Sequence, residues 1–165
     1  IWNMSLGTNT VADIDSFSDF GIALDSIQEI HNVLICKSAG NCRNFEKNRP
    51  VSRIAKSADS VRSLVVGSIA HEKSAFDISE VNHISPFSRI GYGPAGIIKP
   101  ELVSYGGNAG INDVGRTVQT GVKSFGVDGR IMSAVGTSFC SRYRHATFEG
   151  AETTWHNDGQ REWSS

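Results

Sequence analysis

The sequence predicts an α/β fold in which helices cover a mostly parallel sheet. Three observations support this: a helical pattern lies between two strand-like segments near the start of the chain, the second of these strands is an uninterrupted apolar run, and another such run follows later. Strands without polar alternation are buried on both faces, as in parallel sheets covered by helices. At 165 residues, the chain is one domain that can bury about two-thirds of its unfolded surface.

The first elements form a predicted βαβ unit. Residues 1–6 are expected to be a short strand, and residues 33–36 form the uninterrupted apolar run of the second strand. Asp15 and Ser16 are candidate N-caps of the helix between them, and Asn32 stands where that helix should end. Steps of three and four predict the helical stripe: Phe17, Phe20, Leu24, Ile27 and His31. The crossover is expected to be right-handed.

The elements that follow are shorter. Residues 63–70 form a second buried-strand run, and residues 84–90 and 102–105 are further strand candidates. Residues 91–94 are a turn by composition. Because residues 106–129 are rich in Gly, Asn and Asp, we expect them to be mostly loop.

The composition excludes several classes of protein. Sixteen basic residues against 17 acidic ones give a formal net charge of −1, so neither nucleic acid nor an anionic membrane surface is an expected partner. No apolar run reaches the length of about 18 residues that a membrane-spanning helix needs. Three cysteines are too few, and odd in number, for a disulfide scaffold, which favours a reducing compartment such as the cytoplasm.

Three small-residue motifs stand at the ends of predicted strands or at the start of a predicted helix. After Ser5-Leu6, Gly7 would let an extended substrate approach the backbone closely. In Ser38-Ala39-Gly40-Asn41, the Asn41 amide could donate to a developing oxyanion. In Gly136-Thr137-Ser138, the serine could be a nucleophile beside unpaired helix N–H groups. Taken singly, each motif is better explained by a turn or a helix cap.

In this order, the three motifs resemble those of the subtilisin-like serine proteases, the subtilases. Residues 3–7 resemble the strand that walls the first specificity pocket, residues 38–41 the oxyanion segment, and residues 136–139 the nucleophile motif. Residues 64–69 with 85–91 are similar to the middle strands of the family, and residues 99–107 to the segment before its last glycine loop. The resemblance covers about residues 1–139, which we take as the partial catalytic domain.

The resemblance implies a serine endopeptidase with a three-layer, mostly parallel sheet and no cofactor or metal. Ser138 would be the nucleophile and Asn41 the oxyanion donor. The substrate, a peptide or protein, would lie in extended form against six residues: Ser5, Leu6, Gly7, Ser38, Ala39 and Gly40.

Two departures from the family limit this interpretation. The family's Asp-Gly and His-Gly motifs precede the strand that opens this chain, and none of the five histidines is followed by Gly. We therefore expect a sheet that is incomplete on its N-terminal side, an inactive isolated chain, and self-association through the exposed sheet edge. The alternative is a non-catalytic, protease-like module that binds extended peptides or a partner chain.

The second departure is the tail, residues 140–165. Arg142, Arg144 and His145 stand where the family has an apolar helix with small residues and a proline. Some choices of codons for residues 140–145 read Ala-Pro-Asp-Thr-Ala in the next reading frame. We therefore hypothesise that the tail is translated in a shifted reading frame.

Metal sites are not predicted. Cys36 and Cys42 lack a second ligand pair for zinc, so Cys36 is expected in the core and Cys42 at the surface. Asp13, Asp15 and Asp19 lack the spacing of a calcium loop.

Overall fold

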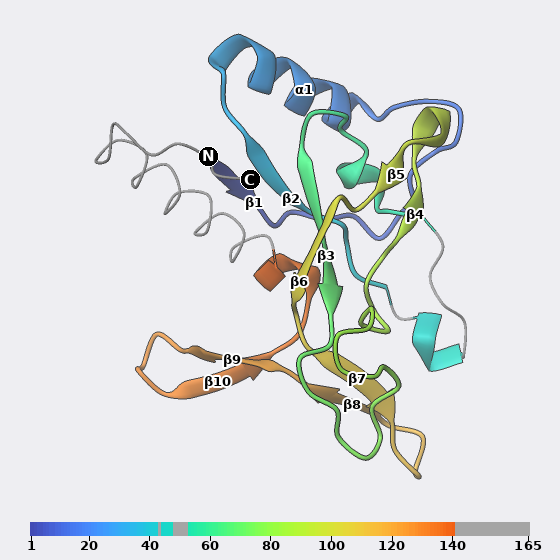
Figure 1. Cartoon of the computed structure of the whole chain (residues 1–165), viewed down its shortest axis with the longest axis vertical. Helices are drawn as coiled ribbons and strands as arrows, with labels where there is room; N and C mark the ends of the chain where they lie inside the picture. Colours follow the sequence, from blue (N-terminus) through green and yellow to red (C-terminus); the bar gives the residue numbers. More distant parts are fainter. Residues whose placement is uncertain (43, 48–52, 141–165) are drawn as a thin grey trace, which may run out of the picture.

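The computed structural model describes residues 1–42, 44–47 and 53–140 (Figure 1). The central elements are β1 (Trp2–Met4), α1 (Asp19–His31), β2 (Ile35–Ser38), β3 (Leu64–Ile69) and β6 (Leu102–Tyr105). The smaller strands are β4 (Gly91–Tyr92), β5 (Ile98–Lys99), β7 (Asn108–Ile111), β8 (Thr117–Thr120), β9 (Val122–Phe125) and β10 (Ile131–Ala134). Three 3₁₀ turns complete the list: η1 (Asn44–Lys47), η2 (Lys56–Ala58) and η3 (Pro94–Gly96). Within the described residues, no helix is both long and apolar enough to cross a membrane.

A four-stranded parallel sheet in the order β1-β2-β3-β6 is the centre of the fold. Its two inner strands are almost entirely buried, which confirms the parallel α/β prediction. Figure 1 shows α1 at one end of the molecule and the antiparallel hairpins β7–β8 and β9–β10 at the other. The carboxyl ends of the central strands therefore point towards the hairpins.

Helix α1 begins later than the sequence predicts. Its N-cap is Ser18, whose hydroxyl accepts from the Gly21 N–H at 3.0 Å, so the prediction of Asp15 or Ser16 was wrong. The cap is fixed from across the core, because Asp59, fully buried, accepts from the Ser18 N–H at 2.7 Å. The helix ends at Asn32 in the left-handed conformation (φ 48°), as predicted.

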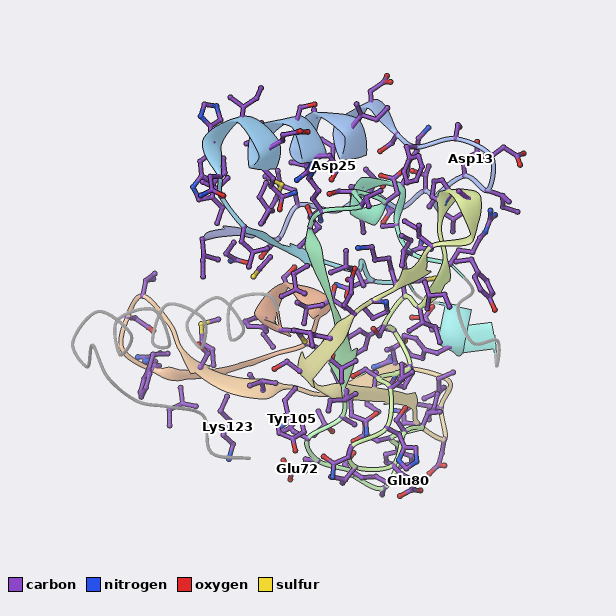
Figure 2. All side chains as sticks on the ribbon, turned by 45° about the horizontal axis from the view of Figure 1, so that its top comes forward. Asp13, Asp25, Glu72, Glu80, Tyr105 and Lys123 are labelled. Atoms are coloured by element: carbon purple, nitrogen blue, oxygen red, sulfur yellow. The ribbon has the colours of Figure 1, made fainter. Side chains whose placement is uncertain are left out.

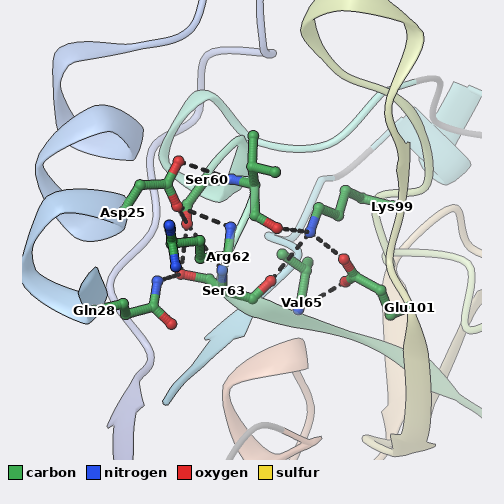
Figure 3. Close-up of polar contacts among 9 residues, drawn as sticks. Asp25, Gln28, Ser60, Arg62, Ser63, Val65, Lys99 and Glu101 are labelled. Carbon is green, nitrogen blue, oxygen red and sulfur yellow. Dashed lines mark hydrogen bonds and ion pairs between the residues drawn. The ribbon is translucent and has the colours of Figure 1, made fainter. Parts of the chain in front are cut away.

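The buried face of α1 also differs from the predicted stripe. Its buried residues are Gly21, Leu24 and Gln28, whereas Phe20 and His31 are exposed. Gly21 allows the closest approach, since a Cβ there would lie 2.3 Å from Asp59 Oδ1. Gln28 can be buried because its amide donates to Ser63 Oγ at 3.1 Å (Figure 3) and accepts from the Ile35 N–H at 2.9 Å. The buried face of α1 is therefore set by polar partners across the core, which the spacing of apolar residues in the sequence does not reveal.

Two of the strand predictions were wrong in position. The second strand is Ile35–Ser38 rather than residues 33–36, because Lys37 and Ser38 find polar partners inside the fold. Residues 84–90 form only two isolated bridges instead of a strand. Serine side chains attach this segment to its neighbours: Ser88 Oγ accepts from the Ser68 N–H at 2.9 Å, and Ser85 Oγ donates to the Gly107 carbonyl at 2.6 Å.

The segment predicted as mostly loop, residues 106–129, contains β7, β8 and β9, and the turn predicted at 91–94 contains β4. Some glycines in the segment serve close packing, whereas Gly115 and Gly129 have φ near +75° and open space around an added Cβ, as turn glycines do. A Cβ on Gly110 would lie 1.6 Å from the Phe76 carbonyl oxygen, so this strand position admits no side chain. Asn112 makes the turn between β7 and β8, where its side-chain oxygen accepts from the N–H groups of Val114 and Arg116.

Candidate active site

The first and third motifs meet at the carboxyl end of the central sheet. Ser5 Oγ donates to the Ser138 carbonyl at 3.3 Å, and Ser138 Oγ donates to the Ser5 carbonyl at 3.4 Å. Both residues are partly buried. The serine of the Gly-Thr-Ser motif therefore lies directly against the segment that follows β1.

The second motif reaches the same place through Asn41. Its Oδ1 accepts from the Thr137 N–H at 2.9 Å and from Thr137 Oγ1 at 3.0 Å. Because a backbone N–H only donates, the atom that faces it must be the amide oxygen, which fixes the orientation of the amide. The Nδ2 donor is thereby left to face Gly136.

Two glycines set the approach of the segment that carries Ser138. Gly136 has φ +145°, and a Cβ there would lie 3.0 Å from Asn41 Nδ2. Gly106, at the end of β6, is closer still: a Cβ would lie 2.4 Å from Ser68 Oγ and 2.8 Å from the Gly136 carbonyl. Gly106 also accepts from the Gly136 N–H at 2.8 Å. Residues 137–140 are helical, so Ser138 stands in the first turn of a helix, as predicted.

A buried arginine holds the backbone at Asn41. Arg89 is 5% exposed, and its Nε donates to the Asn41 carbonyl at 3.1 Å while Nη2 donates to the Asn9 carbonyl at 2.9 Å. Gly40 next to Asn41 has φ +101°, a conformation that favours glycine. A Cβ on Gly40 would also lie 2.7 Å from Ala55 Cβ.

A depression of about 1080 Å³ opens beside this backbone. Asn41 and Arg89 belong to its lining, so the depression borders the place where the three motifs meet. Its other lining residues include Asn9, Phe87, Thr117 and Val135. Its floor and walls are mixed in polarity, as in many ligand sites.

The remaining predicted residues lie along two neighbouring segments. Leu6 is 66% exposed and Gly7 has nothing within 4 Å of an added Cβ, so both face open space. Ser38, Ala39 and Gly40 are buried and continue from β2. The structure therefore brings all eight predicted residues to one edge of the sheet.

The sequence analysis missed three residues that shape this edge: Thr137, Arg89 and Lys37. Lys37 is fully buried, and its ammonium group donates to the carbonyls of Leu6 and Ser38 and to Ser38 Oγ. A lysine directly after an apolar strand run was the available signal, since such a residue needs several acceptors to be buried.

Other candidate groups lie elsewhere or are already occupied. Asp13 lies on the loop before α1 (Figure 2), and the N–H groups of Asp15 and Ile14 that it accepts lower the pKa of its carboxyl. Burial raises the pKa of the Cys36 thiol, as befits a core residue. In the part of the chain that the structure describes, no group of three or more His, Cys, Asp or Glu could hold a metal ion.

Of the histidines, His31 ends α1 and is exposed, and the rings of His71 and Tyr105 lie 6.3 Å apart. His145 and the rest of the proposed tail after Cys140, including the frame hypothesis, lie outside the described residues.

Comparisons with known proteins give a family from the sequence and a fold from solved structures. The sequence matches the model of the subtilase family over residues 1–141. A search of curated proteins finds no match. Among solved structures, the self-cleaved protease domain of PatA is 15% identical with a TM-score of 0.58, covering 96% of this chain and 48% of that one. An S41 psychrophilic protease is 21% identical with a TM-score of 0.57, covering 93% of this chain and 41% of that one.

The prenylagaramide maturation protease PagA is 15% identical, with a TM-score of 0.50, covering 84% of this chain and 38% of that one. At these identities the three structures show the fold alone. The chain spans less than half the length of each of them. The sequence match is the stronger finding, because it extends over most of the chain and includes all three motifs; the chain therefore belongs to the subtilase family.

Proposed function

We propose that this chain supplies the nucleophile, the oxyanion donor and the substrate-binding segments of a serine endopeptidase. The observation that carries the proposal is the meeting of Ser5, Asn41 and Ser138 at one edge of the sheet, in a chain of the subtilase family. Each of the three comes from a different part of the sequence. A fold that needed these residues only as turns and caps would not have to bring them together.

In the proposed reaction, Ser138 Oγ attacks the carbonyl carbon of the scissile peptide and gives its proton to a general base. The carbonyl oxygen then carries the negative charge. Asn41 is suited to stabilise that charge because Thr137 holds its Oδ1, which leaves the Nδ2 donor beside Gly136, two residues before Ser138. The Ser138 N–H, in the first turn of a helix, is the second donor.

Substrate binding is proposed to use the segments on either side. Residues 5–7 have open space in front of Leu6 and Gly7, where an extended peptide could add as a further strand. The Ser5 carbonyl, which accepts from Ser138 Oγ in this structure, would then accept from a substrate N–H. Residues 38–40 form the opposite wall.

The general base is proposed to come from the Asp and His motifs of the family, which this sequence does not match. We also propose that the fold has the family's three-layer arrangement and that the sheet of this chain is incomplete on its N-terminal side. Accordingly, we expect the isolated chain to be nearly inactive. The gene upstream of Ile1 should encode Asp-Thr-Gly-like and His-Gly-Thr-like motifs.

A fluorophosphonate probe tests the proposal on the isolated chain, because its phosphorus accepts the serine oxygen and releases fluoride. Labelling should be slow, confined to Ser138, and about tenfold faster with added imidazole as an external base. Asn41→Ala should lower the imidazole-dependent rate on the order of 100-fold. Ser138→Ala should abolish labelling, and Ser133→Ala, on an exposed position of β10, is the matched control.

Two outcomes would contradict parts of this proposal. Labelling that is spread over several serines, or that does not depend on Asn41, would favour the alternative of a non-catalytic module that binds extended peptides. Rapid stoichiometric labelling of Ser138 without imidazole would show that the chain contains its own base.

A further inference from the structure

Strands β1 and β2 separate at a defined point, and a buried lysine stands there. Their parallel pairing ends at the partners Met4 and Lys37. Beyond it, Ala39 turns to other neighbours: its N–H donates to the Val66 carbonyl at 3.0 Å and its carbonyl accepts from the Ala55 N–H at 3.0 Å. The main chains of residues 5–7 and 38–40 thus leave carbonyls that need donors.

Lys37 provides these donors. Its ammonium group donates to the Leu6 carbonyl on one side and to the Ser38 carbonyl and Ser38 Oγ on the other, the last two at 3.3 Å. An ammonium group has three N–H donors, so these acceptors account for all of them. The side chain therefore joins the two segments where the backbone does not.

Among the described segments that pack against it, the charge of this lysine has no neutralising partner. Residues 1–7 contain no acidic or basic side chain, and β3, whose Val65 is the register partner of Lys37, contains none either. Cys36 is the titratable neighbour on its own strand, and its thiol is kept neutral by burial. Since Lys37 is fully buried, the cost of removing its charge from water is offset, among the described residues, by the carbonyls of Leu6 and Ser38 and by the Ser38 hydroxyl.

We propose that Lys37 is a positioning residue that sets the distance between the two substrate-binding segments, residues 5–7 and 38–40. The inference rests on the proposed function for the role of those segments. A bound peptide must fit between them, so the group that joins them controls how well they are placed before the peptide arrives.

Protonation should control this role. Burial lowers the pKa of Lys37 from 10.5 to about 8. Above that pH the amine keeps two N–H donors for three acceptors and loses its charge, so the segments are held less firmly. By linkage, a peptide that binds the held arrangement favours the ammonium form.

The first arm of the test is hydrogen exchange on the whole chain. Lys37→Met keeps the apolar stem and removes the donors. We expect amides of residues 5–9 and 38–41 to exchange about tenfold faster in this variant than in the parent chain. Lys99→Met is the matched control, because Lys99 is also buried and donates to the carbonyls of Val61 and Ser63, just before β3, and to Glu101, none of which belongs to residues 5–7 or 38–40 (Figure 3).

The second arm measures binding of fluorescein-labelled hexapeptides, varied at one central position, to the Ser138→Ala chain. Between about pH 6.5 and about pH 9.5 the affinity should fall about fivefold, with a midpoint near the pKa of Lys37, and this change should be absent when Lys37→Met is added. Lys99→Met should keep the pH profile. If Lys37 had only a structural role, its replacement would lower the stability of the chain but would leave the pH dependence of peptide affinity in place.

The outcomes separate the two proposals. Unchanged exchange at residues 5–9 in Lys37→Met, or the same increase in Lys99→Met, would overturn the positioning role. If no chain binds any peptide, the binding arm counts against the proposed function, and exchange alone decides on Lys37. Should Lys37→Met fail to fold, Ser38→Ala, which removes one acceptor and leaves the lysine, should give a smaller increase in exchange at the same residues.

Discussion

Ser5 and Ser138 lie 133 positions apart in the sequence, yet each hydroxyl donates to the main-chain carbonyl of the other. The two hydrogen bonds close the edge of the sheet between the first strand and the last described helix turn. They also mean that Ser138 Oγ is turned towards a carbonyl oxygen, so it must rotate about its Cα–Cβ bond before it could attack a substrate. The pair is therefore both a structural contact and a resting state of the proposed nucleophile.

This pair can be tested by stability. Ser5→Ala removes one of the two hydrogen bonds and should lower the free energy of unfolding by about 1 kcal/mol. Ser138→Ala should have an effect of similar size. Urea unfolding measures both changes. Ser26→Ala is the control, since that hydroxyl bonds only within α1, to the Ile22 carbonyl at 2.9 Å, and its loss should not destabilise the chain.

Gly106 should tolerate no side chain. In Gly106→Ala the added Cβ would meet Ser68 Oγ, Cys140 Sγ at 2.6 Å and the Gly136 carbonyl, so we expect a loss of about 1–3 kcal/mol in stability. Gly7→Ala is the matched control, because nothing lies within 4 Å of its added Cβ. Thermal unfolding of both variants is the measurement. Equal stability of the two would contradict the tight approach described here.

The buried lysine predicts an unusual dependence of stability on pH. The unfolded chain keeps the Lys37 proton up to the ordinary pKa of 10.5, whereas the folded chain releases it near 8. Between these values the unfolded state binds more protons, so the free energy of unfolding should rise with pH. The shift corresponds to about 3 kcal/mol. Lys37→Met should lack this rise, and the difference between the two chains across pH 8 to 10.5 isolates it from other groups.

We propose that the chain self-associates through β1, the outer strand of the described sheet. Trp2 is 47% exposed there, and its N–H donates to the Leu34 carbonyl, just before β2, at 2.8 Å. Because main-chain groups alternate in direction along a strand, the Asn3 N–H points to the open edge. Asn3→Pro should therefore shift the chain towards monomer in sedimentation at about 20–50 µM. A parent chain that sediments as a clean monomer would contradict this proposal.

Much of the central fold could be predicted from the sequence, because it depends on local patterns. The apolar run at 63–70 and the end of the helix at Asn32 are such patterns, and the structure confirms both. The three small-residue motifs, expected at strand ends and at a helix start, lie together at one edge of the sheet in the structure.

The elements that could not be predicted depend on partners far away in the sequence. Asp59 binds the N-cap residue Ser18 and so fixes where α1 begins. The Phe76 carbonyl lies so close to Gly110 that only glycine fits there. Counting glycines in residues 106–129 therefore suggested loop where the chain forms hairpins. Likewise, a buried Lys37 makes sense only when the carbonyl of Leu6 is known to lie beside it.

The Asn41–Thr137 contact has a consequence for how the chain acquires its site. The contact joins residues 96 positions apart, and the sheet beneath it pairs strands that follow one another only after long crossovers. Contacts of such long range form late and slowly during folding. On a ribosome that synthesises the chain from its N-terminus, Asn41, the proposed oxyanion donor, would wait for nearly all the described residues before its partner Thr137 emerged. The site is thus a product of the completed fold and cannot assemble on a partly synthesised chain.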